Sequence, residues 1–298
     1  MKIYISFKPT DNPYGGGNQF LRSLKKTFSS LNCLTNSAPE ADIILYNGHH
    51  EIEQTVRLKS KFPDKIFVHR MDGLQKLYNN PSDKRQDLAI TFNKLATATV
   101  FQSNWAKEEF AKVGFAPSES TVIYNASDPD IFNTKYTKKP SPKTRLLCTS
   151  WSENINKGFN FYKILDDSLD FNKFDFTFIG NKPAQFEYKN ILCLPPIDTL
   201  GISSRLRQAD IFVSATVNDC CSNSIIEALS CGVPVLAKNS GGNPELIKNG
   251  GLTFNDLNDF VSHLDEMSEN LKLFTDNVKI KNIIDIAKDY TNYFKCLY

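Results

Sequence analysis

The sequence predicts an α/β protein made of two Rossmann-like, doubly wound domains that face each other across a central cleft. Short apolar runs alternate with stretches of helical spacing along almost the whole chain. Strands that are apolar at every position are typical of parallel sheets covered by helices on both faces. The chain has 298 residues, which suffice for two domains of about 130–150 residues each.

A polar, proline-rich stretch near the middle of the chain separates two copies of this pattern. Residues 133–144 read NTKYTKKPSPKT, which is typical of a linker. We therefore expect a first domain over 1–138 and a second over 144–281, with a final helix at about 282–298 packing back on the first. The first copy has strand candidates at 2–6, 42–46, 65–69, 98–102 and 121–125, and the second at 145–150, 174–180, 190–194, 210–215 and 234–238.

Composition excludes several classes of protein. Charged residues make up 23% of the chain and the net charge is +2, without the concentrated basic face of a nucleic-acid-binding protein. No apolar run approaches the roughly 20 residues of a membrane span, so we expect at most peripheral membrane contact. The seven cysteines include no C-x-x-C pair, and the four histidines show no zinc-ligand spacing. We therefore expect a cytoplasmic protein with reduced thiols and no metal, and the opening MKIYISF predicts no signal peptide.

Residues 218–251 contain the most informative pattern. A strand candidate ends just before this segment, and a helix is expected to begin at Ser222 or Asn223 and to stop at Gly232. The start of a helix at the carboxyl end of a parallel strand offers N–H groups and the positive end of the helix dipole. Both suit a diphosphate.

Two carboxylates flank this predicted anion site. Asp219 precedes the helix, and Glu227 lies about one turn inside it. Carboxylates accept hydrogen bonds from hydroxyl groups, so one suits a sugar ring and the other a ribose. The alternative interpretation is an N-capping Asp219 and a solvated Glu227.

The same segment resembles the signature of retaining glycosyltransferase family four, which has the GT-B fold. Asp219 is followed after seven residues by Glu227 and the run ALSCGVPV, and the block GGNPELI follows at 241–247. The resemblance implies that Glu227 holds the nucleotide ribose, that Asp219 holds hydroxyls of the donor sugar, and that the amides of Ser222, Asn223 and Ser224 hold the diphosphate. The family usually has Glu where this chain has Asp219.

The loop after the first strand of the second domain resembles the family's R-L-x-x-x-K-G loop. The resemblance implies that Lys157 neutralises the diphosphate; the alternative is an exposed structural lysine. Trp151 and Ser152 stand where the family's arginine is expected. Arg70 or Arg205 is a candidate for the missing charge.

Segments of the first half agree with the resemblance. Gly15, Gly16 and Gly17 belong to a glycine-rich run, NPYGGGN, after the first strand, which in the family faces the donor phosphate and acceptor; the alternative is a plain turn. The segments at 102–105 and 123–132 resemble two further family motifs. We expect Ser103 to cap a helix.

Further candidates stand at predicted strand ends. Family members have a histidine or acidic residue pointing at the reacting sugar, for which His69 and Asp72 are both candidates. Either may instead be structural, and for His49 and His50 a loop role is favoured over a place in the site. In the second domain, Gly180 and Ile197 are expected to frame the base. Trp151 of that domain and Arg70 of the first domain are also expected to bind the substrate.

The resemblance implies an enzyme that moves a sugar, with retention, from a nucleotide-diphosphate sugar to an acceptor glycan, lipid or small molecule. It implies no cofactor and no metal. The alternative is a non-catalytic nucleotide-sugar or glycan-binding protein derived from such an enzyme. The motifs specify neither the base nor the sugar.

Overall fold

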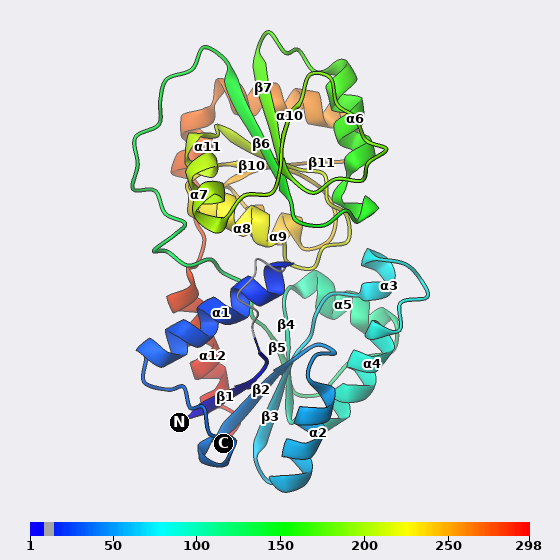
Figure 1. Ribbon diagram of the computed structural model, residues 1–298, viewed down its shortest axis with the longest axis vertical. Helices are drawn as coiled ribbons and strands as arrows, with labels where there is room; N and C mark the ends of the chain where they lie inside the picture. Colours follow the sequence, from blue (N-terminus) through cyan, green and yellow to red (C-terminus); the bar gives the residue numbers. More distant parts are fainter. Residues whose placement is uncertain (9–14) are drawn as a thin grey trace. The chain divides into compact units, whose positions relative to one another are not determined.

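The computed structural model describes residues 1–8 and 15–298, and the chain divides into two compact units (Figure 1). Unit 1 comprises Met1–Ala126 and Lys281–Tyr298, and unit 2 comprises Ser127–Ile280. Each unit has one parallel sheet between helices. The predicted α/β class, with two Rossmann-like units, is confirmed. Within the described residues, no helix is both long and apolar enough to cross a membrane.

Unit 1 contains a five-stranded parallel sheet whose strands follow the order β1-β2-β3-β4-β5. The segment around Leu34 pairs with Ile3 of β1, because Ile3 N donates to Cys33 O at 2.7 Å and Thr35 N donates to Ile3 O at 2.9 Å. The chain therefore passes to one side of β1 before β2 forms on the other. The strands are β1 (Ile3–Ser6), β2 (Ile43–Asn47), β3 (Ile66–Arg70), β4 (Ala98–Phe101) and β5 (Ser120–Val122).

Helices cover both faces of this sheet. On one face α1 and α12 pack side by side (Figure 1), with Phe20 and Phe28 against Tyr290. On the other face Tyr46 and Phe67 form a second core with Phe92. The helices are α1 (Gly15–Ser30), η1 (Ala38–Glu40), α2 (Ile52–Lys61), α3 (Gln75–Tyr78), α4 (Arg85–Phe92), η2 (Asn93–Leu95), α5 (Asn104–Lys112) and α12 (Ile283–Lys295).

Unit 2 contains a six-stranded parallel sheet in the order β11-β10-β9-β6-β7-β8. The chain runs outward from β6 to β8, crosses back to β9 and runs outward again to β11, which is the doubly wound arrangement. The strands are β6 (Thr144–Ser150), β7 (Phe174–Gly180), β8 (Leu192–Leu194), β9 (Ile211–Ser214), β10 (Val235–Lys238) and β11 (Gly251–Phe254).

The main core of unit 2 joins one face of its sheet to α6, α10 and α11. On the other face α7 and α8 contact β6, β9 and each other. The helices are η3 (Ile155–Lys157), α6 (Phe159–Ser168), α7 (Thr199–Gln208), α8 (Asn223–Ser230), α9 (Asn243–Ile247), α10 (Leu257–Glu269) and α11 (Leu271–Asp276).

The boundary between the units falls earlier than the sequence analysis places it. Residues 127–138 belong to unit 2 because they are bonded to its helices. Ser203 Oγ donates to Ile131 O at 2.5 Å, and Tyr136 OH donates to Cys231 O at 3.3 Å. The stretch 133–144 is therefore held at one end against unit 2 and is not a free linker.

Asp166 is a buried carboxylate that organises the approach to β8. Its side chain is 0% exposed, and it accepts hydrogen bonds from the backbone N–H groups of Lys189, Asn190 and Ile191 at 2.7–2.9 Å. Burial raises its pKa, but these N–H donors and Lys163 outweigh burial, so the pKa is lowered overall. The neighbouring Asp167 is exposed and contacts only Lys163 among the described residues.

We expect Asp166→Ala to lower the free energy of unfolding by about 3 kcal/mol or more, because it leaves three N–H groups without their acceptor. Asp167→Ala, the matched control, is expected to cost about 0.5 kcal/mol. Urea unfolding measures both. The lowered pKa means that the Asp166 contribution is present near neutral pH and is lost as the pH falls through the folded-state value. Equal stability losses in the two variants would contradict this assignment.

Candidate active site

The strand order of unit 2 places a candidate site at the carboxyl ends of β6 and β9. These two strands pair with each other, but the chain leaves them in opposite directions across the sheet. The loops that follow them, 151–158 and 215–222, therefore lie where the strand order reverses. Open parallel sheets bind ligands at such a switch point.

Close backbone contacts lock these two loops together. Val217 N donates to Asn156 O at 2.9 Å. Gly158 has φ +88°, and a Cβ on it would lie 2.4 Å from the Cβ of Ala215. Only glycine permits this approach in this conformation. The loop of Lys157 is thereby fixed against the loop of Asp219.

A third loop braces Asp219 from the side of β10. Gly242 N donates to Asp219 O at 2.9 Å, and a Cβ on Gly241 (φ +63°) would lie 2.3 Å from that same oxygen. The fully buried Asn243 donates through Nδ2 to Thr216 O at 3.1 Å. The GGN run of the sequence therefore acts as a support for the loop that holds Asp219.

Lys157 and Asp219 form an ion pair at this edge. The Nζ atom of Lys157 lies 3.3 Å from Asp219 Oδ2, and both side chains are 17% exposed. The other oxygen, Oδ1, accepts a hydrogen bond from Cys221 N at 3.2 Å. The structure thus brings together two residues that stand 62 positions apart in the chain.

Helix α8 begins beside this ion pair. Ser222 is the N-cap residue and Asn223 the first helical residue, as predicted, and Gly232 (φ +71°) follows the C-cap residue Cys231. Ser222 Oγ pairs with Ser224 Oγ at 3.1 Å rather than capping the helix. The first N–H groups of a helix lack intrahelical partners and attract anions.

Glu227 lies one turn into α8. It is half-buried, and its carboxyl group makes no hydrogen bond or ion pair with any residue in the described part of the chain. Burial raises the pKa of this carboxyl group to about 8. A carboxylate in such a place has acceptor capacity that the protein itself does not use.

Trp151 follows β6, Gly180 is the last residue of β7, and Ile197 lies between β8 and α7. The Trp151 side chain is 40% exposed, and its carbonyl accepts a hydrogen bond from Asn181 Nδ2 at 2.9 Å. Gly180 has φ +133°, and a Cβ on it would lie 1.8 Å from Ser150 O. Ile197 is half-buried just before α7. Gly180 is therefore required by the close approach of the ends of β6 and β7.

The two candidate residues near the end of β3, His69 and Asp72, have different environments in unit 1. His69 is 0% exposed and stacks on Tyr46 with ring centroids 4.3 Å apart. Burial lowers its pKa to about 4, so the ring is neutral at neutral pH. Its Nε2 donates to Gly48 O at 2.9 Å and its Nδ1 accepts from Asn93 Nδ2 at 3.0 Å. His69 is a structural residue, which corrects its place among the catalytic candidates.

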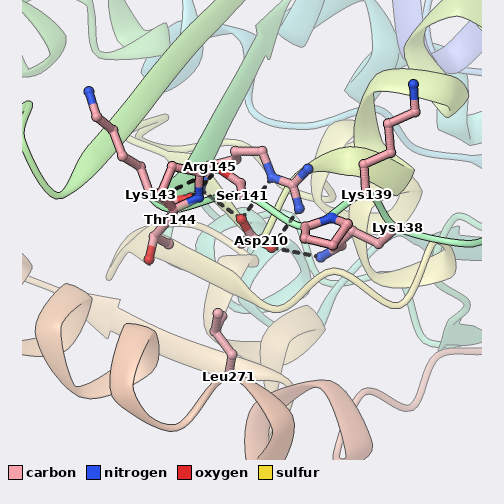
Figure 2. Close-up of a pocket in the computed structure, with 10 residues that line it drawn as sticks. Lys138, Lys139, Ser141, Lys143, Thr144, Arg145, Asp210 and Leu271 are labelled. Carbon is pink, nitrogen blue, oxygen red and sulfur yellow. Dashed lines mark hydrogen bonds and ion pairs between the residues drawn. The ribbon is translucent and has the colours of Figure 1, made fainter.

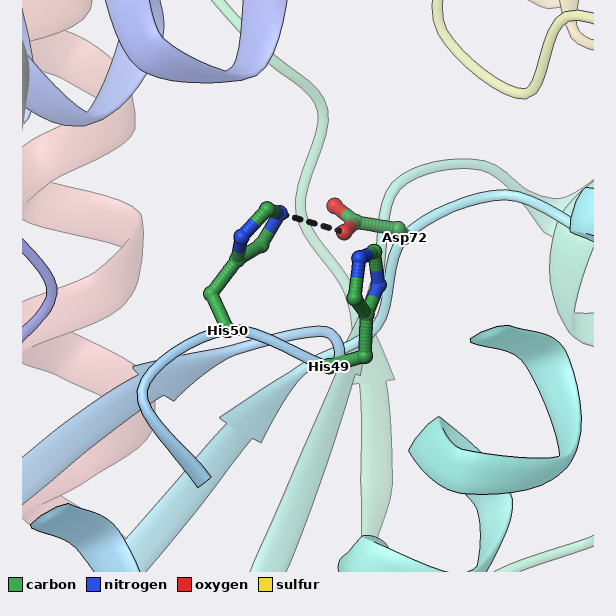
Figure 3. A group of neighbouring side chains, drawn as sticks. All are labelled: His49, His50 and Asp72. Carbon is green, nitrogen blue, oxygen red and sulfur yellow. Dashed lines mark ion pairs between the residues drawn. The ribbon is translucent and has the colours of Figure 1, made fainter. Parts of the chain in front are cut away.

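Asp72, by contrast, faces an open region beyond the strand ends. Its side chain is 20% exposed, and it lies beside His49 and His50, whose rings turn toward its carboxylate (Figure 3). Asn47 Nδ2 donates to Asp72 Oδ1 at 3.3 Å, and Gln102 Nε2 donates to the same atom at 3.4 Å. Burial and the neighbouring His50 lower the pKa of His49.

Arg70 is not available to a ligand, in contrast to its predicted role. Its side chain is 0% exposed, and the guanidinium lies 4.6 Å from the centre of the Phe20 ring. Its Nη1 and Nη2 donate to Asn47 Oδ1 and Asn125 Oδ1, both at 2.5 Å. Arg70 therefore stabilises the interior of unit 1 and does not replace the missing arginine of the second unit.

The glycine-rich run lies partly outside the described residues. Asn12, Pro13 and Tyr14 fall outside them, whereas Gly15, Gly16 and Gly17 form the first turn of α1. Nothing lies within 4 Å of a Cβ placed on Gly17, and its φ is not positive. Gly17 thus leaves open space at the start of a 16-residue helix.

Other motifs of the first half have structural roles. Ser103 Oγ accepts a hydrogen bond from Ala106 N at 3.1 Å, which confirms the predicted cap of α5. Asp128 Oδ1 accepts from Asp130 N at 2.9 Å in a turn. The supports Asn243, Asn47 and Gln102 were not singled out from the sequence, because amides of this kind are common and only the fold shows what they contact.

A basic pocket of unit 2 lies away from this site (Figure 2). It has a volume of about 320 Å³ and begins beside Thr144, at the amino end of β6. Lys138 Nζ and Arg145 Nε each lie 3.0 Å from an oxygen of Asp210. These two cations are already paired, so the pocket offers an anion less charge than its lysines suggest.

Comparisons with known proteins show the fold of the whole chain and a family similarity for part of unit 2. The family model "Glycosyl transferases group 1" matches residues 156–270, a segment that contains Lys157, Asp219 and Glu227. No curated protein matches the chain by sequence. Similar solved structures share the fold at low identity, so the match of residues 156–270 is the finding that bears on the family.

Three of these structures cover nearly the whole chain. Sucrose-phosphate synthase from Thermosynechococcus elongatus is 12% identical with a TM-score of 0.76, covering 99% of this chain and 98% of its own. HepE from Anabaena in complex with UDP is 15% identical with a TM-score of 0.76, covering 99% and 100%. The lipopolysaccharide outer core galactosyltransferase WaaB, in its apo form, is 13% identical with a TM-score of 0.70 and covers 100% of both chains.

The fold is that of the GT-B glycosyltransferases to which these solved structures belong. Within unit 2, residues 156–270 are similar to the group 1 glycosyltransferases.

We expect Gly241→Ala to be more destabilising than Gly114→Ala. Both glycines have positive φ, +63° and +81°, but only Gly241 faces another part of the backbone, whereas nothing lies within 4 Å of a Cβ on Gly114. The strained conformation should cost each variant about 1–2 kcal/mol. Displacement of Asp219 should cost Gly241→Ala about 1–3 kcal/mol more. Urea unfolding measures the difference, and equal losses would contradict the bracing role of Gly241.

Glu227→Gln is expected to change the pH dependence of stability. The folded pKa of about 8 lies above the ordinary value of 4.5, so the native protein keeps a proton that the unfolded chain releases. This contribution is present below the unfolded value and is lost as the pH rises through about 8. The neutral variant should therefore match the wild type near about pH 5 and exceed it by roughly 1–3 kcal/mol near pH 9. The exposed Glu266→Gln serves as control, and a variant curve parallel to that of the wild type would contradict the raised pKa.

Proposed function

We propose that this protein is a retaining glycosyltransferase that moves a sugar from a nucleoside diphosphate sugar to an acceptor glycan, lipid or small molecule without a metal cofactor. One observation supports this most. Unit 2 holds the Lys157–Asp219 pair in the loops before α8, and one turn into α8 lies Glu227, whose carboxyl group has no partner among the described residues. A cation, amide donors and a carboxylate are the groups that a nucleoside diphosphate sugar requires.

The diphosphate is proposed to lie against the first turn of α8, at Ser222, Asn223 and Ser224. Its negative charge would be met there by backbone N–H groups, by the helix dipole and by the ammonium of Lys157. The loop 151–158 contains one basic residue, Lys157. We therefore expect removal of the Lys157 side chain to lower kcat/KM.

The two carboxylates are proposed to bind hydroxyl groups. Glu227 would accept hydrogen bonds from the ribose, and Asp219 from the donor sugar. An unpaired and partly desolvated carboxyl group gains more from such donors than one in bulk water. Because hydrogen bonds favour the ionised form, nucleotide binding would also release the proton that Glu227 holds below about pH 8.

Uridine nucleotides are the first donors to test. HepE from Anabaena has been crystallised with UDP, with UDP-glucose, and with UDP and glucose. These structures cover 99% of this chain at 14–15% identity. Gly180, Ile197 and Trp151 are the residues that we propose to frame the base and the diphosphate.

In the proposed reaction the bond between the sugar and the diphosphate breaks and negative charge grows on the leaving phosphate. Preorganised N–H groups and Lys157 stabilise that charge, as a metal ion does in other transferases. The acceptor attacks on the face from which the phosphate departs, which retains the configuration at the anomeric carbon. In unit 1, Asp72 is the residue proposed to face the reacting sugar, because His69 is buried. We propose a cytoplasmic enzyme with at most peripheral membrane contact.

A non-catalytic nucleotide-sugar or glycan-binding protein is the second candidate. Two observations favour it: Asp219 is one methylene shorter than the usual glutamate, and Ser152 with Trp151 takes the place of the loop arginine. Such a protein would bind the nucleotide sugar but would neither transfer nor hydrolyse the sugar.

A thermal-shift screen against UDP, GDP, ADP and their sugars is expected to show one family of nucleotides that raises the melting temperature. With that donor, product formation should persist in excess EDTA, and the product should keep the anomeric configuration of the donor by NMR. Lys157→Ala should lower kcat/KM by about 10²–10³. Lys173→Ala, an exposed change at the opposite end of β7, should leave it unaltered.

Three outcomes would decide against the proposal. Binding without turnover would favour the non-catalytic candidate, and loss of turnover in EDTA would refute the metal-free mechanism. An inverted product would refute retention.

A further inference from the structure

Three side chains converge at the carboxyl ends of two neighbouring strands of unit 1, β2 and β3. His49 and His50 follow β2, and Asp72 follows the neighbouring strand β3. One ligand atom from each residue lies within 4.8 Å of the other two. Figure 3 shows both imidazole rings on the side of the Asp72 carboxylate, and the two ring centres lie 4.3 Å apart.

The two oxygens of Asp72 have different surroundings. Oδ1 lies 3.5 Å from Arg70 Nη1 and accepts from Gln102 Nε2 at 3.4 Å. Oδ2 instead faces His50, whose Nε2 lies 3.8 Å away. Asn47 Nδ2 donates weakly to both oxygens, at 3.3 Å to Oδ1 and 3.4 Å to Oδ2, so buried groups hold the carboxylate and Oδ2 is the oxygen nearer to His50. Carboxylate ligands of metal ions are commonly held in this way by hydrogen bonds from a second layer of residues.

Both histidines are also able to bind a ligand through a ring nitrogen. His49 Nδ1 is buried and has no hydrogen-bond partner among the described residues, which is a costly state for a ring nitrogen. His50 is 45% exposed at its side chain and lies edge-on to Phe7, 5.6 Å between ring centres. One ring is thus fixed in the protein, while the other can adjust to a ligand.

We propose that His49, His50 and Asp72 bind a transition-metal ion of the Zn²⁺ type. Two imidazoles and a carboxylate are a donor set that suits zinc, and they leave one tetrahedral position open to water. In such a site the ligand atoms stand about 3.3 Å apart, which follows from bond lengths of about 2.0–2.1 Å. The 3.8 Å between His50 and Asp72 needs only a small adjustment, and the other separations, at most 4.8 Å, need side-chain movements of both histidines.

The ion is not a cofactor for sugar transfer. It would occupy the carboxylate of Asp72, so that Zn²⁺ and the reacting sugar compete for the same group. Zn²⁺ is therefore an inhibitor, and this consequence alone rests on the proposed function. The metal binding itself does not depend on it.

Titration of the tag-free, full-length protein with Zn²⁺ in a calorimeter, and with Co²⁺ in a spectrophotometer, tests the site. One equivalent should bind, and Co²⁺ should give the intense visible absorption of tetrahedral nitrogen and oxygen ligation. His50→Ala and Asp72→Asn should each weaken binding by about tenfold or more. His263→Ala, in which a histidine hydrogen-bonded to Thr253 O is removed from unit 2, should bind as the wild type does.

Equal Zn²⁺ affinity in the wild type and in a folded His50→Ala variant would overturn the proposal, as would loss of binding in His263→Ala. Unfolding curves establish that the variants are folded, and His50 is exposed enough that its removal should not affect them. If the protein transfers sugar, Zn²⁺ should inhibit the wild type at concentrations that leave His50→Ala active. Binding without inhibition would uphold the metal site and refute only the competition with the sugar.

Discussion

The candidate active site depends on a set of backbone contacts among three loops at one edge of the sheet of unit 2. Val217 N binds Asn156 O, Gly242 N binds Asp219 O, and Gly158 packs on Ala215. These contacts hold Lys157 and Asp219 at ion-pair distance without help from their own side chains. A site built on such contacts is preorganised, because its charged groups need not be arranged when a ligand arrives.

The polar residues near the ends of β2 and β3 in unit 1 differ in how deeply they are buried. His69 and Arg70 end β3 but are completely buried, where they hold the loop after β2 and the residue Asn125. Two positions later, Asp72 emerges with His49 and His50. The period of a strand places successive side chains on opposite faces, but only the burial of each face decides which polar residue meets solvent. This distinction separates the structural histidine from the exposed carboxylate.

Much of the fold was predictable because apolar strands and amphipathic helices alternate regularly. All ten predicted strands occur, with ends that differ by two residues or fewer at most positions. The exceptions have local reasons. The strand β11 was missed because it has four residues and begins at Gly251, where a Cβ would lie 1.9 Å from Val235 O. The helix α4 was not singled out because its apolar residues do not follow one helical face. The helix α10 was also not singled out, although Phe260, Leu264 and Met267 follow one face of it.

The sequence alone determined the two α/β units and the start and end of α8. It also placed Lys157 and Asp219 in loops that follow strands, and Glu227 one turn into α8. These features follow from local periodicity, helix caps and glycines, which act over a few residues. Tertiary structure decided that Arg70 and His69 are buried, that residues 127–138 belong to unit 2, and that His49, His50 and Asp72 meet. Such facts depend on which strands lie side by side, since pairing in a parallel sheet joins residues that no local pattern connects.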